Sequence, residues 1–505
     1  MRIIKTLNLY ENSVVLLGMA THIKTSMTDK QFLEKEIASW LNSPIRKMQF
    51  DSVRYYEGNH DILGHKRMVI NEKGDLEENK NLVNNQIVDN QYSRAVDKKV
   101  NYFCGLPFTF DTKNKAYAEA LNNYFTPKRR KKIKTAAKKA ILGGKSWVFP
   151  YYEGESNELE YLVYPAESVL PFWADEEHTI LDCAVHFYPV VVYNHNAEKE
   201  IVFKADIIHG GGMDKCIWED GSLIPDPDAE SGNYISVTNP DTGKVEEKNW
   251  GKIPFICFKG NENEIPLIKK VKCLQDALNT LHSNLMNAME ENVHNTVLVI
   301  HNYDGTNLGE FRKNLAAYQA IKVRGDGKVE PLKLEFDVSN AEIVEKLIRK
   351  AIIENAGCYD GKDERLSSTP NQLNIKSMYM DMDLDNNELI SEFQAGFEEL
   401  LYFINAYFAN AGIGNFEGEK VDVIFNPDVL INESETIDNI NKSADLSLET
   451  RIKMHPYVKD AEEELQRIKK EREEAMKQQD PYRNAFESQK NSGKGNEGGE
   501  PVNEE

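Results

Sequence analysis

Residues Asn263 to Val293, "NEIPLIKKVKCLQDALNTLHSNLMNAMEENV", carry apolar side chains at steps of three and four, the spacing that places them on one face of an α-helix. These positions are Leu267, Val271, Leu274, Leu278, Leu281, Leu285 and Met289. Asn263 is a suitable N-cap, and Pro266 is tolerated in a first helical turn. The segment therefore predicts a helix of about thirty residues, roughly 45 Å long.

A second helix is predicted further along, after a small β-rich segment. "SNAEIVEKLIRKAIIENAG" begins with a capping box, Ser339 to Glu342, and ends at Gly357. Its apolar face consists of Ile343, Val344, Leu347, Ile348, Ala351 and Ile352. The segment between the helices contains the strand "TVLVI", a short helix around 308–318 and the hairpin "AIKVRGDGKVEPLKL", which turns at 325–327. Two helices that flank a β-rich insert predict a stalk with a knob at its tip, an unusual design for an enzyme.

The stretch "DMDLDNNELISE", from Asp381 to Glu392, has the acidic spacing of a calcium-binding EF-hand loop. Asn386 stands where such a loop needs Gly for its sharp turn. Helical spacing also continues through the stretch, at Met378, Met382, Leu389, Phe393, Phe397, Leu400 and Ile404. We therefore predict one long helix that begins near Ile375, with three carboxylates near its start, where they would interact favourably with the helix dipole: Asp381, Asp383 and Asp385.

The first half of the chain predicts an α+β arrangement. Helices are expected at about 28–41 and 84–103 and from about Pro127 onward. The runs "SWVFPYY", "LEYLVY", "DCAVHFYPVVVY" and "EIVFKADII" are separated by turn residues, as in an antiparallel sheet. The end of the chain, from about Lys477, is polar and Gly-rich and predicts a disordered tail.

Length and composition exclude several classes of protein. The chain has 505 residues, enough for about three domains, and a net charge of −21, which disfavours tight wrapping of nucleic acid. Its six cysteines form no CxxC pair, so neither a disulfide framework nor a zinc site is expected. No apolar run approaches the length of a membrane span, and the cytoplasm is the expected compartment.

Two motifs contain residues typical of a site of chemistry. "LGGKSW" contains the Gly-Lys-Ser of a P-loop, but Lys139 stands at the first glycine position, and a helix precedes the motif where a strand is required. A helix stop at these glycines is the preferred interpretation. "NHDILGHKR" offers His60, Asp61 and His65 as metal ligands, although a surface turn is favoured. No catalytic constellation, metal site or cofactor site is predicted.

The run "PKRRKKIKTAAKKA" is the strongest basic segment. Its apolar residues form one face of a helix, which leaves a basic face on the other side, consisting of Lys128, Arg129, Arg130, Lys131, Lys134 and Lys138. Two interpretations stay open: a solvated face, or a face that contacts DNA or an acidic neighbouring subunit.

Five segments, in order, resemble the portal proteins of tailed bacteriophages, in the branch typical of long-tailed phages of Gram-positive bacteria. They are "RYYEGNHDIL", "NNQIVDNQYSRAVDKKVNYFCGLPFTF", "AAKKAILGGKSWVFPYYE" with "YPAESVLPFWAD", "LNIKSMYMDMDLDNNELISEFQAGFEEL" and "SLETRIKMHPYVKDAEEELQRIKKERE". The resemblance covers about Val53 to Glu474. It departs from the family's pattern before the long helix, where Pro370 replaces a Gly-containing turn.

The resemblance implies portal architecture: an α+β wing, a two-helix stem, a small β-rich clip, a tunnel loop followed by a long helix, and a helical crown. The corresponding segments are an N-terminal extension at 1–50, the wing at 51–262, stem helices at 263–293 and 339–357, the clip at 294–338, the tunnel loop at 358–374, the long helix at 375–430, the crown at 431–475 and a disordered tail at 476–505.

The resemblance also implies a ring of about twelve subunits at one capsid vertex, through which double-stranded DNA enters and leaves. The implied partners are the terminase, head–tail adaptor or connector proteins, and capsid and scaffolding proteins, with assembly in the host cytoplasm and no membrane. The tunnel loop would face the channel with Lys362, Asp363, Glu364, Arg365, Ser368, Asn371 and Gln372. The alternatives are a metal-dependent enzyme acting on nucleic acid, with metal held by the three aspartates, and another virion ring or adaptor component.

Overall fold

The structure is a computed structural model that describes residues 29–70, 74–80, 82–154, 157–193, 197–238, 245–294, 297–300, 309, 324–326, 329–332, 338–359, 372–425, 433–443, 445–455, 457–458 and 461–479. The chain divides into two units. The first consists of Met1–Asp360 and Tyr379–Asp428, and the second of Gly361–Met378 and Val429–Glu505. The first unit contains the sheets and the stalk.

A five-stranded antiparallel sheet forms one part of the first unit, in the order β10-β9-β8-β7-β6. Its strands are β6 (Val169–Trp173), β7 (Leu181–Tyr193), β8 (Lys199–His209), β9 (Gly212–Glu219) and β10 (Ser222–Pro225). Helix α2 (Asp29–Leu41) covers one face of this sheet, where Phe32, Leu33 and Ile37 are buried against sheet residues such as Phe172 and Val185. The predicted runs "DCAVHFYPVVVY" and "EIVFKADII" are antiparallel neighbours here, whereas "SWVFPYY" and "LEYLVY" belong to a second sheet. The prediction of antiparallel strands is therefore confirmed, but that of a single sheet is wrong.

A three-stranded sheet, in the order β13-β4-β5, lies beside a group of helices. Its strands are β4 (Lys145–Tyr152), β5 (Leu159–Pro165) and β13 (Ile256–Lys259). Helix α6 (Pro127–Gly143) packs on β4 and β5 through Ile133, Ala136, Ala137 and Ala140. The nearby elements are α3 (Pro44–Tyr56), α4 (Gln91–Phe103), β3 (Thr109–Asp111), α5 (Lys115–Tyr124) and β16 (Asp422–Ile424), which pairs with β3.

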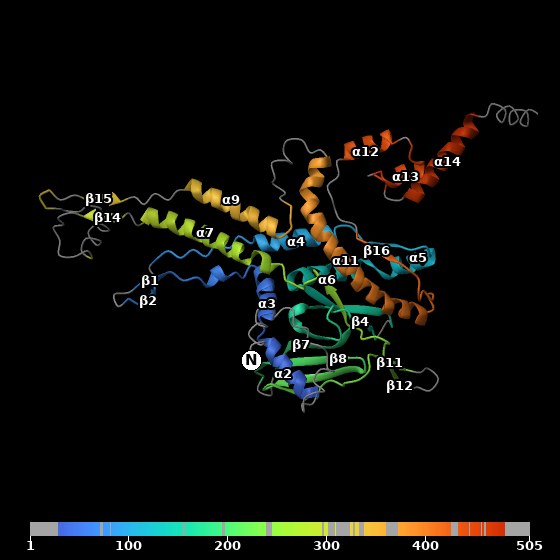
Figure 1. Cartoon of the computed structure of the whole chain (residues 1–505), viewed down its shortest axis with the longest axis horizontal. Coiled ribbons are helices and arrows are strands. Elements are labelled where there is room, and N and C mark those ends of the chain that lie inside the picture. The colour runs from blue at the N-terminus through green and yellow to red at the C-terminus, as the bar shows by residue number, and fades with distance from the viewer. Residues whose placement is uncertain are drawn as a thin grey trace, which may run out of the picture. The chain divides into compact units, whose positions relative to one another are not determined.

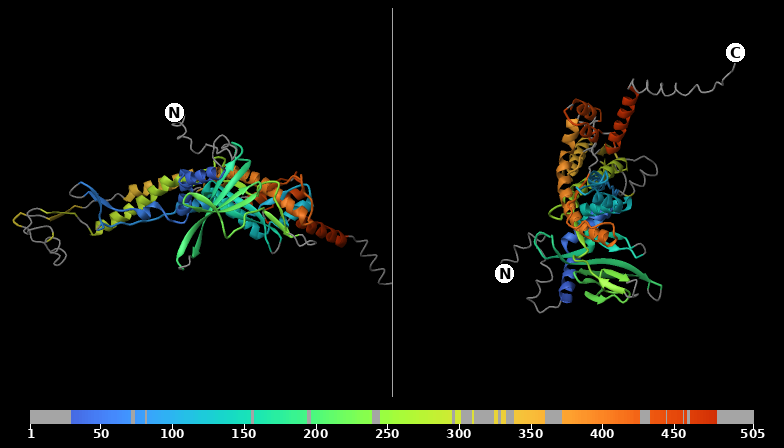
Figure 2. Two further views of the ribbon diagram at one scale, coloured as in Figure 1. Left: turned by 90° about the horizontal axis from the view of Figure 1, so that it is seen from below. Right: turned by 90° about the vertical axis from the view of Figure 1, so that its right-hand side faces the viewer.

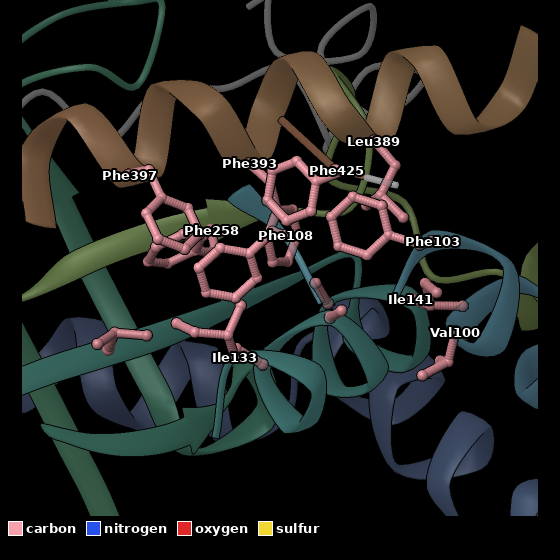
Figure 3. Packing of buried hydrophobic residues seen from close by; sticks show 14 of the residues in the cluster. Val100, Phe103, Phe108, Ile133, Ile141, Phe258, Leu389, Phe393, Phe397 and Phe425 are labelled. Atoms are coloured by element: carbon pink, nitrogen blue, oxygen red, sulfur yellow. The ribbon is translucent and has the colours of Figure 1, made fainter. Parts of the chain in front are cut away.

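Helix α11 (Gln372–Asn410) crosses this body and contributes aromatic side chains to its main core. Figure 3 shows Phe393 and Phe397 of α11 facing Phe103, Phe108 and Phe258. The ring centroids of Phe103 and Phe393 are 4.9 Å apart, and those of Phe108 and Phe397 are 5.3 Å apart. The apolar residues that predicted this helix from Leu389 to Ile404 are therefore the ones that are buried in the core.

The stalk consists of α7 (Ile268–His294) and α9 (Val338–Asn355), which lie side by side and project from the body. Strands β14 (Val297–Ile300) and β15 (Val329–Leu332) pair antiparallel at its far end (Figure 1). Two helices with a small sheet between them in sequence confirm the predicted stalk. The predicted short helix at 308–318, apart from residue 309, and the first arm of the predicted hairpin lie outside the described residues.

The stalk is accompanied by a hairpin, β1 (Met68–Ile70) with β2 (Leu76–Glu78). Two short helical turns, η2 (Asp61–Gly64) and η3 (Ala166–Ser168), and a second hairpin, β11 (Ile235–Thr238) with β12 (Val245–Lys248), complete the first unit's described elements (Figures 1 and 2). The second unit has α12 (Glu433–Lys442), α13 (Leu448–Lys453) and α14 (Ala461–Gln479). None of the helices in the described ranges is both long and apolar enough to cross a membrane.

The predicted starts of three helices are wrong. Helix α7 begins at Ile268, not Asn263, because the Asn261 side chain exchanges two hydrogen bonds with the Ile265 backbone, at 2.8 and 2.9 Å, and closes a loop before the helix. Helix α9 already includes Ser339, so that residue is no N-cap. Helix α4 begins at Gln91 rather than residue 84.

Three further differences from the predicted elements concern the tail, the start of the long helix and two helices that were not expected. Helix α14 continues to Gln479, so the predicted tail does not start at 476, and residues 480–505 lie outside the described part. Helix α11 begins at Gln372, three residues before the predicted start. Helices α3 and α5 were not predicted at all.

Candidate functional site

Helix α9 ends in a tight turn that leads toward the predicted tunnel loop. Gly357 has a φ of 62°, a backbone conformation that glycine adopts without strain. The Cys358 N–H donates to the Ile353 carbonyl and the Gly357 N–H donates to the Glu354 carbonyl, both at 3.0 Å. This pair of bonds is the Schellman motif, which ends a helix at a fixed position. The predicted helix stop at Gly357 is confirmed.

Helix α4 holds the residues that follow this turn. The Cys358 thiol lies 3.6 Å from the Ala95 carbonyl oxygen and donates to it, and burial raises the pKa of Cys358. The Lys98 ammonium donates to the Tyr359 carbonyl at 3.0 Å and lies 4.8 Å from the centroid of its ring. The first end of the predicted loop is thus fixed to α4.

The same helix also holds α11. Lys99 forms an ion pair with Asp385, and the Tyr102 hydroxyl donates to the Asp383 carboxylate. The Lys99 side chain is 10% exposed and that of Asp385 is 31% exposed, so water screens their attraction less than it would on an open surface. We call these α4-centred contacts the loop anchor, defined by Lys98, Lys99, Tyr102, Gly357, Cys358, Tyr359, Asp383 and Asp385.

The prediction that the aspartates of α11 interact with the helix dipole is wrong. Because α11 begins at Gln372, the aspartates lie beyond the first turns, where the helix dipole has little effect. Asp383 and Asp385 instead bind side chains of α4. The helix continues through the whole stretch, so the EF-hand interpretation is excluded, as predicted.

Most of the predicted loop residues lie outside the described part of the chain: Lys362, Asp363, Glu364, Arg365, Ser368 and Asn371. Gln372 was predicted in the loop but is the first residue of α11. The loop anchor therefore gives the positions of the residues that precede the loop and of α11 from Asp383 onward.

The predicted basic face is only partly a surface. Arg129 lies four residues before Ile133, on the buried side of α6, and is 6% exposed. It pairs with Glu158 at 2.7 Å and with Glu160 at 2.9 Å. The prediction of a surface position is therefore wrong for Arg129.

The other members of this face are divided between internal contacts and solvent. Arg130 donates to the Phe125 carbonyl at 2.8 Å, and Lys134 donates to the Asn101 side chain at 2.8 Å. Lys138 donates to the Tyr56 hydroxyl. Lys128 and Lys131 are exposed, so a contact with DNA or with an acidic neighbour stays a prediction for them.

The sequence profile described as "Phage portal protein, SPP1 Gp6-like" matches residues 47–478. The chain belongs to this family. Two curated relatives agree with the assignment. The portal protein of Bacillus phage SPP1 is 26% identical over 452 residues, which is 88% of this chain and 86% of that protein. The portal protein of Clostridium phage phiCD119 is 23% identical over 453 residues, which is 86% of this chain and 94% of that protein.

Solved structures with similarity to the chain include two from gene transfer agent particles. One is the neck of an empty particle computed with C6 symmetry, with a TM-score of 0.37 and 11% identity. The other is the neck of a native particle computed with C12 symmetry, with a TM-score of 0.35 and 12% identity. Each match covers 72% of this chain and 89% of the solved chain.

In this member of the portal family, the Gly-Lys-Ser segment is a structural joint. Helix α6 ends at Gly144, which has a φ of 83°, and β4 follows, so the predicted helix stop is confirmed. Lys145 pairs with the Glu264 carboxylate, whose other oxygen lies 2.7 Å from His178 Nδ1. Burial alone would raise the pKa of Glu264, but the Lys145 ammonium and His178 lower it to about 2. The Lys145 ammonium therefore forms an ion pair with a carboxylate of its own chain.

The His60 segment is also part of the fold, and His60 is buried rather than on a surface turn. Its ring lies 3.0 Å from the Tyr55 carbonyl and 2.8 Å from the Asn279 side chain. Asp61 pairs with Arg54 and Lys272. Within the described ranges, no group of three or more His, Cys, Asp or Glu side chains is arranged to hold a metal ion.

The sequence analysis missed a contact along helix α7 of the stalk. Residues 82–90, which we call the strap, have no helix or strand structure, although 84–90 were predicted as the first part of a helix. The backbone N–H groups of three strap residues donate to side chains of α7: Asn85 to Asn287 at 2.7 Å, Ile87 to Ser283 at 3.0 Å and Asp89 to Asn279 at 3.0 Å.

The spacing of these bonds has a geometric basis. Every second residue of an extended chain advances about 6.6 Å, and every fourth residue of an α-helix advances about 6 Å, so the two repeats nearly match. Gln275 continues the row, because it accepts from the Tyr92 N–H at 3.0 Å and donates to the Asp89 carbonyl at 2.7 Å. We call Gln275, Asn279, Ser283 and Asn287 the polar ladder. All four are at most 2% exposed, and their regular spacing is the signal that sequence analysis could have used.

Proposed function

We propose that the protein forms a ring of about twelve copies at one vertex of a phage capsid, and that genomic double-stranded DNA passes through this ring during packaging and ejection. The observation that carries the proposal is the family match over residues 47–478, most of the chain. The stalk with its small terminal sheet supports it, because the resemblance independently implies a two-helix stem with a clip at the tip.

The proposed parts of the subunit follow from this assignment. Residues 51–262 would be the wing, 263–293 and 339–357 the stem, 294–338 the clip and 431–475 the crown. The clip is the proposed docking place for head–tail adaptor or connector proteins, because short strand edges bind most readily to strands of a neighbouring chain. Terminase, capsid and scaffolding proteins are the other proposed partners, and assembly would occur in the host cytoplasm.

The tunnel loop is the proposed contact with moving DNA. Lys362 and Arg365 carry the positive charge that attracts phosphate, while Asp363 and Glu364 oppose it, so contacts would be brief. The loop anchor supports this role, because it fixes the chain where it leaves α9. The loop could then contact the DNA while α9 and α4 keep their positions.

The charge of the chain suits a channel that must not retain DNA. With a net charge of −21 per chain, a ring of about twelve copies would carry about 250 negative charges, which repel phosphates overall. A strongly basic channel would instead bind the DNA and slow it.

We propose no catalytic activity for this protein. The alternative, a metal-dependent enzyme acting on nucleic acid, needs the aspartates of α11 to converge on a metal ion. Asp383 and Asp385 instead bind Tyr102 and Lys99, so using them for metal would first require breaking the loop anchor. Another virion ring or adaptor component is disfavoured, because the match covers nearly the full length of known portal proteins.

The test places a photo-crosslinking amino acid at Ser368 and, as the matched control, at Tyr193, which is 72% exposed in the proposed wing. Capsids assembled with each variant are allowed to package DNA and are then irradiated. The proposal predicts protein–DNA adducts from position 368 and none above background from position 193. Adducts from position 193 alone would contradict the proposed channel.

A further inference from the structure

Strands β7 and β8 extend beyond the part of the five-stranded sheet that α2 covers. On the face that packs against α2, Phe187 and Ala205 lie opposite each other and are 4 and 0% exposed. The next pair on the same face consists of Pro189 and Phe203, and Phe203 is 42% exposed. The cover that α2 gives to this face therefore ends between these two pairs.

The uncovered part of this face is apolar almost to the ends of the two strands. Val191 lies opposite Ile201, and Tyr193 follows on the same face, because successive side chains of a strand alternate between faces. Val191, Ile201 and Tyr193 are 49, 56 and 72% exposed. A solvated face of an antiparallel sheet normally carries polar side chains. We call Val191, Tyr193, Ile201 and Phe203 the open face.

The open face continues the core that α2 covers. The rings of Phe187 and Phe203 stack with their centroids 5.5 Å apart, and Phe187 in turn contacts Trp40 of α2, with the ring centroids 6.3 Å apart. A further apolar segment placed beside α2 would therefore extend an existing core, rather than form a separate one.

An apolar run of the same chain lies shortly before α2 in the sequence. Residues 1–28 are outside the described part of the chain. They include "VVLLGMA", from Val14 to Ala20, which contains no charged residue. Eight residues, Thr21 to Thr28, separate this run from Asp29, the first residue of α2. Eight extended residues span at most about 26 Å.

The open face lies within that reach. The Leu223 N–H of β10 donates to the Glu34 carboxylate in the second turn of α2, at 2.9 Å. Leu223 lies opposite Trp218, and Trp218 lies opposite Phe203, so Phe203 is two strands away, about 10 Å. Each further pair of residues along β8 adds about 6.6 Å. The chain that leads into α2 can therefore reach the open face on the side where α2 already lies.

The short link favours this run over a separate molecule as the occupant. Joining two binding partners by a short link raises their effective concentration to the millimolar range. A second copy would have to bind the open face much more tightly to compete at ordinary protein concentrations. The run is also uncharged, so its burial would leave no charge unpaired.

We propose that residues 14–20 dock on the open face of the same chain and continue the cover that α2 begins. The open face is then a binding site for an apolar segment, and its occupant belongs to the chain itself. This inference does not depend on the proposed ring, because it concerns a contact within one subunit.

The test places one thiol on the open face and one on the run, in a Cys273→Ser background, because Cys273 is an exposed cysteine. Ile201→Cys is combined with Leu16→Cys in one chain and with Leu17→Cys in another, since adjacent residues sample different sides of the run. Oxidation should form a disulfide within the chain for at least one of these two pairs. The matched control uses Glu200→Cys in place of Ile201→Cys, because Glu200 is also exposed but points to the other face of the sheet. The control pairs should link far less.

Isotope labelling identifies the chain that supplies the run. Unlabelled and ¹⁵N-labelled chains are mixed before oxidation, and the linked peptides are analysed by mass spectrometry. The inference predicts linked peptides in which both halves carry the same label. Peptides of mixed label at the statistical level would show that another copy occupies the open face and would overturn the inference. The absence of linked peptides from both pairs would overturn it as well.

A fluorescence measurement gives a readout that does not depend on disulfides. A polarity-sensitive dye attached to Ile201→Cys should emit at shorter wavelength in the otherwise natural chain than in a chain with Leu16→Asp and Leu17→Asp, because carboxylates oppose burial of the run. The control carries Ser13→Asp and Thr21→Asp, which add the same charge beside the run, and should keep the shorter wavelength. Equal emission from all three chains would contradict the docking.

Discussion

At the scale of single residues, Glu264 joins three parts of the first unit. Its carboxylate binds Lys145 at the start of β4 and His178 in the turn before β7, and Glu264 itself lies just before α7. The close fit extends to the backbone, since a Cβ at Gly144 would lie 2.0 Å from the Glu264 carbonyl oxygen. Lys145 and Gly144 of the P-loop-like segment thus both contact Glu264, just before the first helix of the stalk.

This joint predicts a loss of stability in acid. The pKa of Glu264 is about 2 in the folded protein and 4.5 for an ordinary glutamate, so its ionised form stabilises the fold fully above about pH 4.5. That contribution, on the order of 3 kcal/mol, is lost as the pH falls toward 2. Thermal unfolding from pH 6 to pH 3 should show a steeper loss for the natural chain than for Glu264→Gln.

The matched control for this prediction is Glu262→Gln, because Glu262 is exposed on the same loop. This variant should follow the natural chain across the whole pH range. Equal slopes for the natural chain and Glu264→Gln would show that the carboxylate is not held in its ionised form by Lys145 and His178.

Sequence reasoning identified Gly357, Asp383 and Asp385 of the loop anchor but not the α4 side chains that bind there. The acidic stretch of α11 was identified as helical from its apolar spacing, and that prediction is correct. Its carboxylates bind Lys99 and Tyr102, which are more than 280 residues earlier in the chain. No local pattern contains such a pairing, because it is created by the packing of α4 against α11. The same holds for Arg129, whose position depends on which face of α6 the strands cover.

At the scale of elements, periodic apolar spacing predicted α7, α9 and α11 but not where they begin. Start positions depend on side chains that bind the backbone, such as Asn261 before α7 and Asn90 before α4, whose side chain accepts from the Ser93 N–H at 2.9 Å. Several polar residues offer such bonds, and sequence alone does not select among them. The strap was wrongly predicted as a helix because the sequence does not show that side chains of α7 accept its backbone N–H groups.

The polar ladder predicts local changes in hydrogen exchange. Ser283→Ala removes the acceptor for the Ile87 N–H, which leaves a half-buried donor without this partner at a cost on the order of 1 kcal/mol. Exchange at Ile87 and its neighbours in the strap should therefore accelerate, and the rest of the body should stay protected. Hydrogen–deuterium exchange followed by mass spectrometry would measure this.

Thr280→Ala is the control on the same helix, because Thr280 is exposed and its hydroxyl bonds the Asp276 carbonyl four residues earlier in α7. It should leave strap exchange unchanged. If Ser283→Ala also left it unchanged, the ladder would not be what holds the strap on α7.

At the scale of the whole molecule, the order of motifs was more informative than any one of them. Each of the five segments that resemble portal proteins is weak alone, and together they predicted the family that the match over residues 47–478 establishes. The order of motifs does not predict the conformation of the proposed tunnel loop. Its sequence is polar and has Pro370 where the family pattern has a Gly-containing turn.

The central claim is that the protein works as a ring, and its assembled mass tests that claim most directly. Native mass spectrometry of the purified protein, with electron microscopy of the same sample, would count the subunits. The account predicts closed rings with a central channel and a mass near twelve times 57.7 kDa. A protein that remains a 57.7 kDa monomer at every concentration, or forms only closed dimers without a channel, would contradict it.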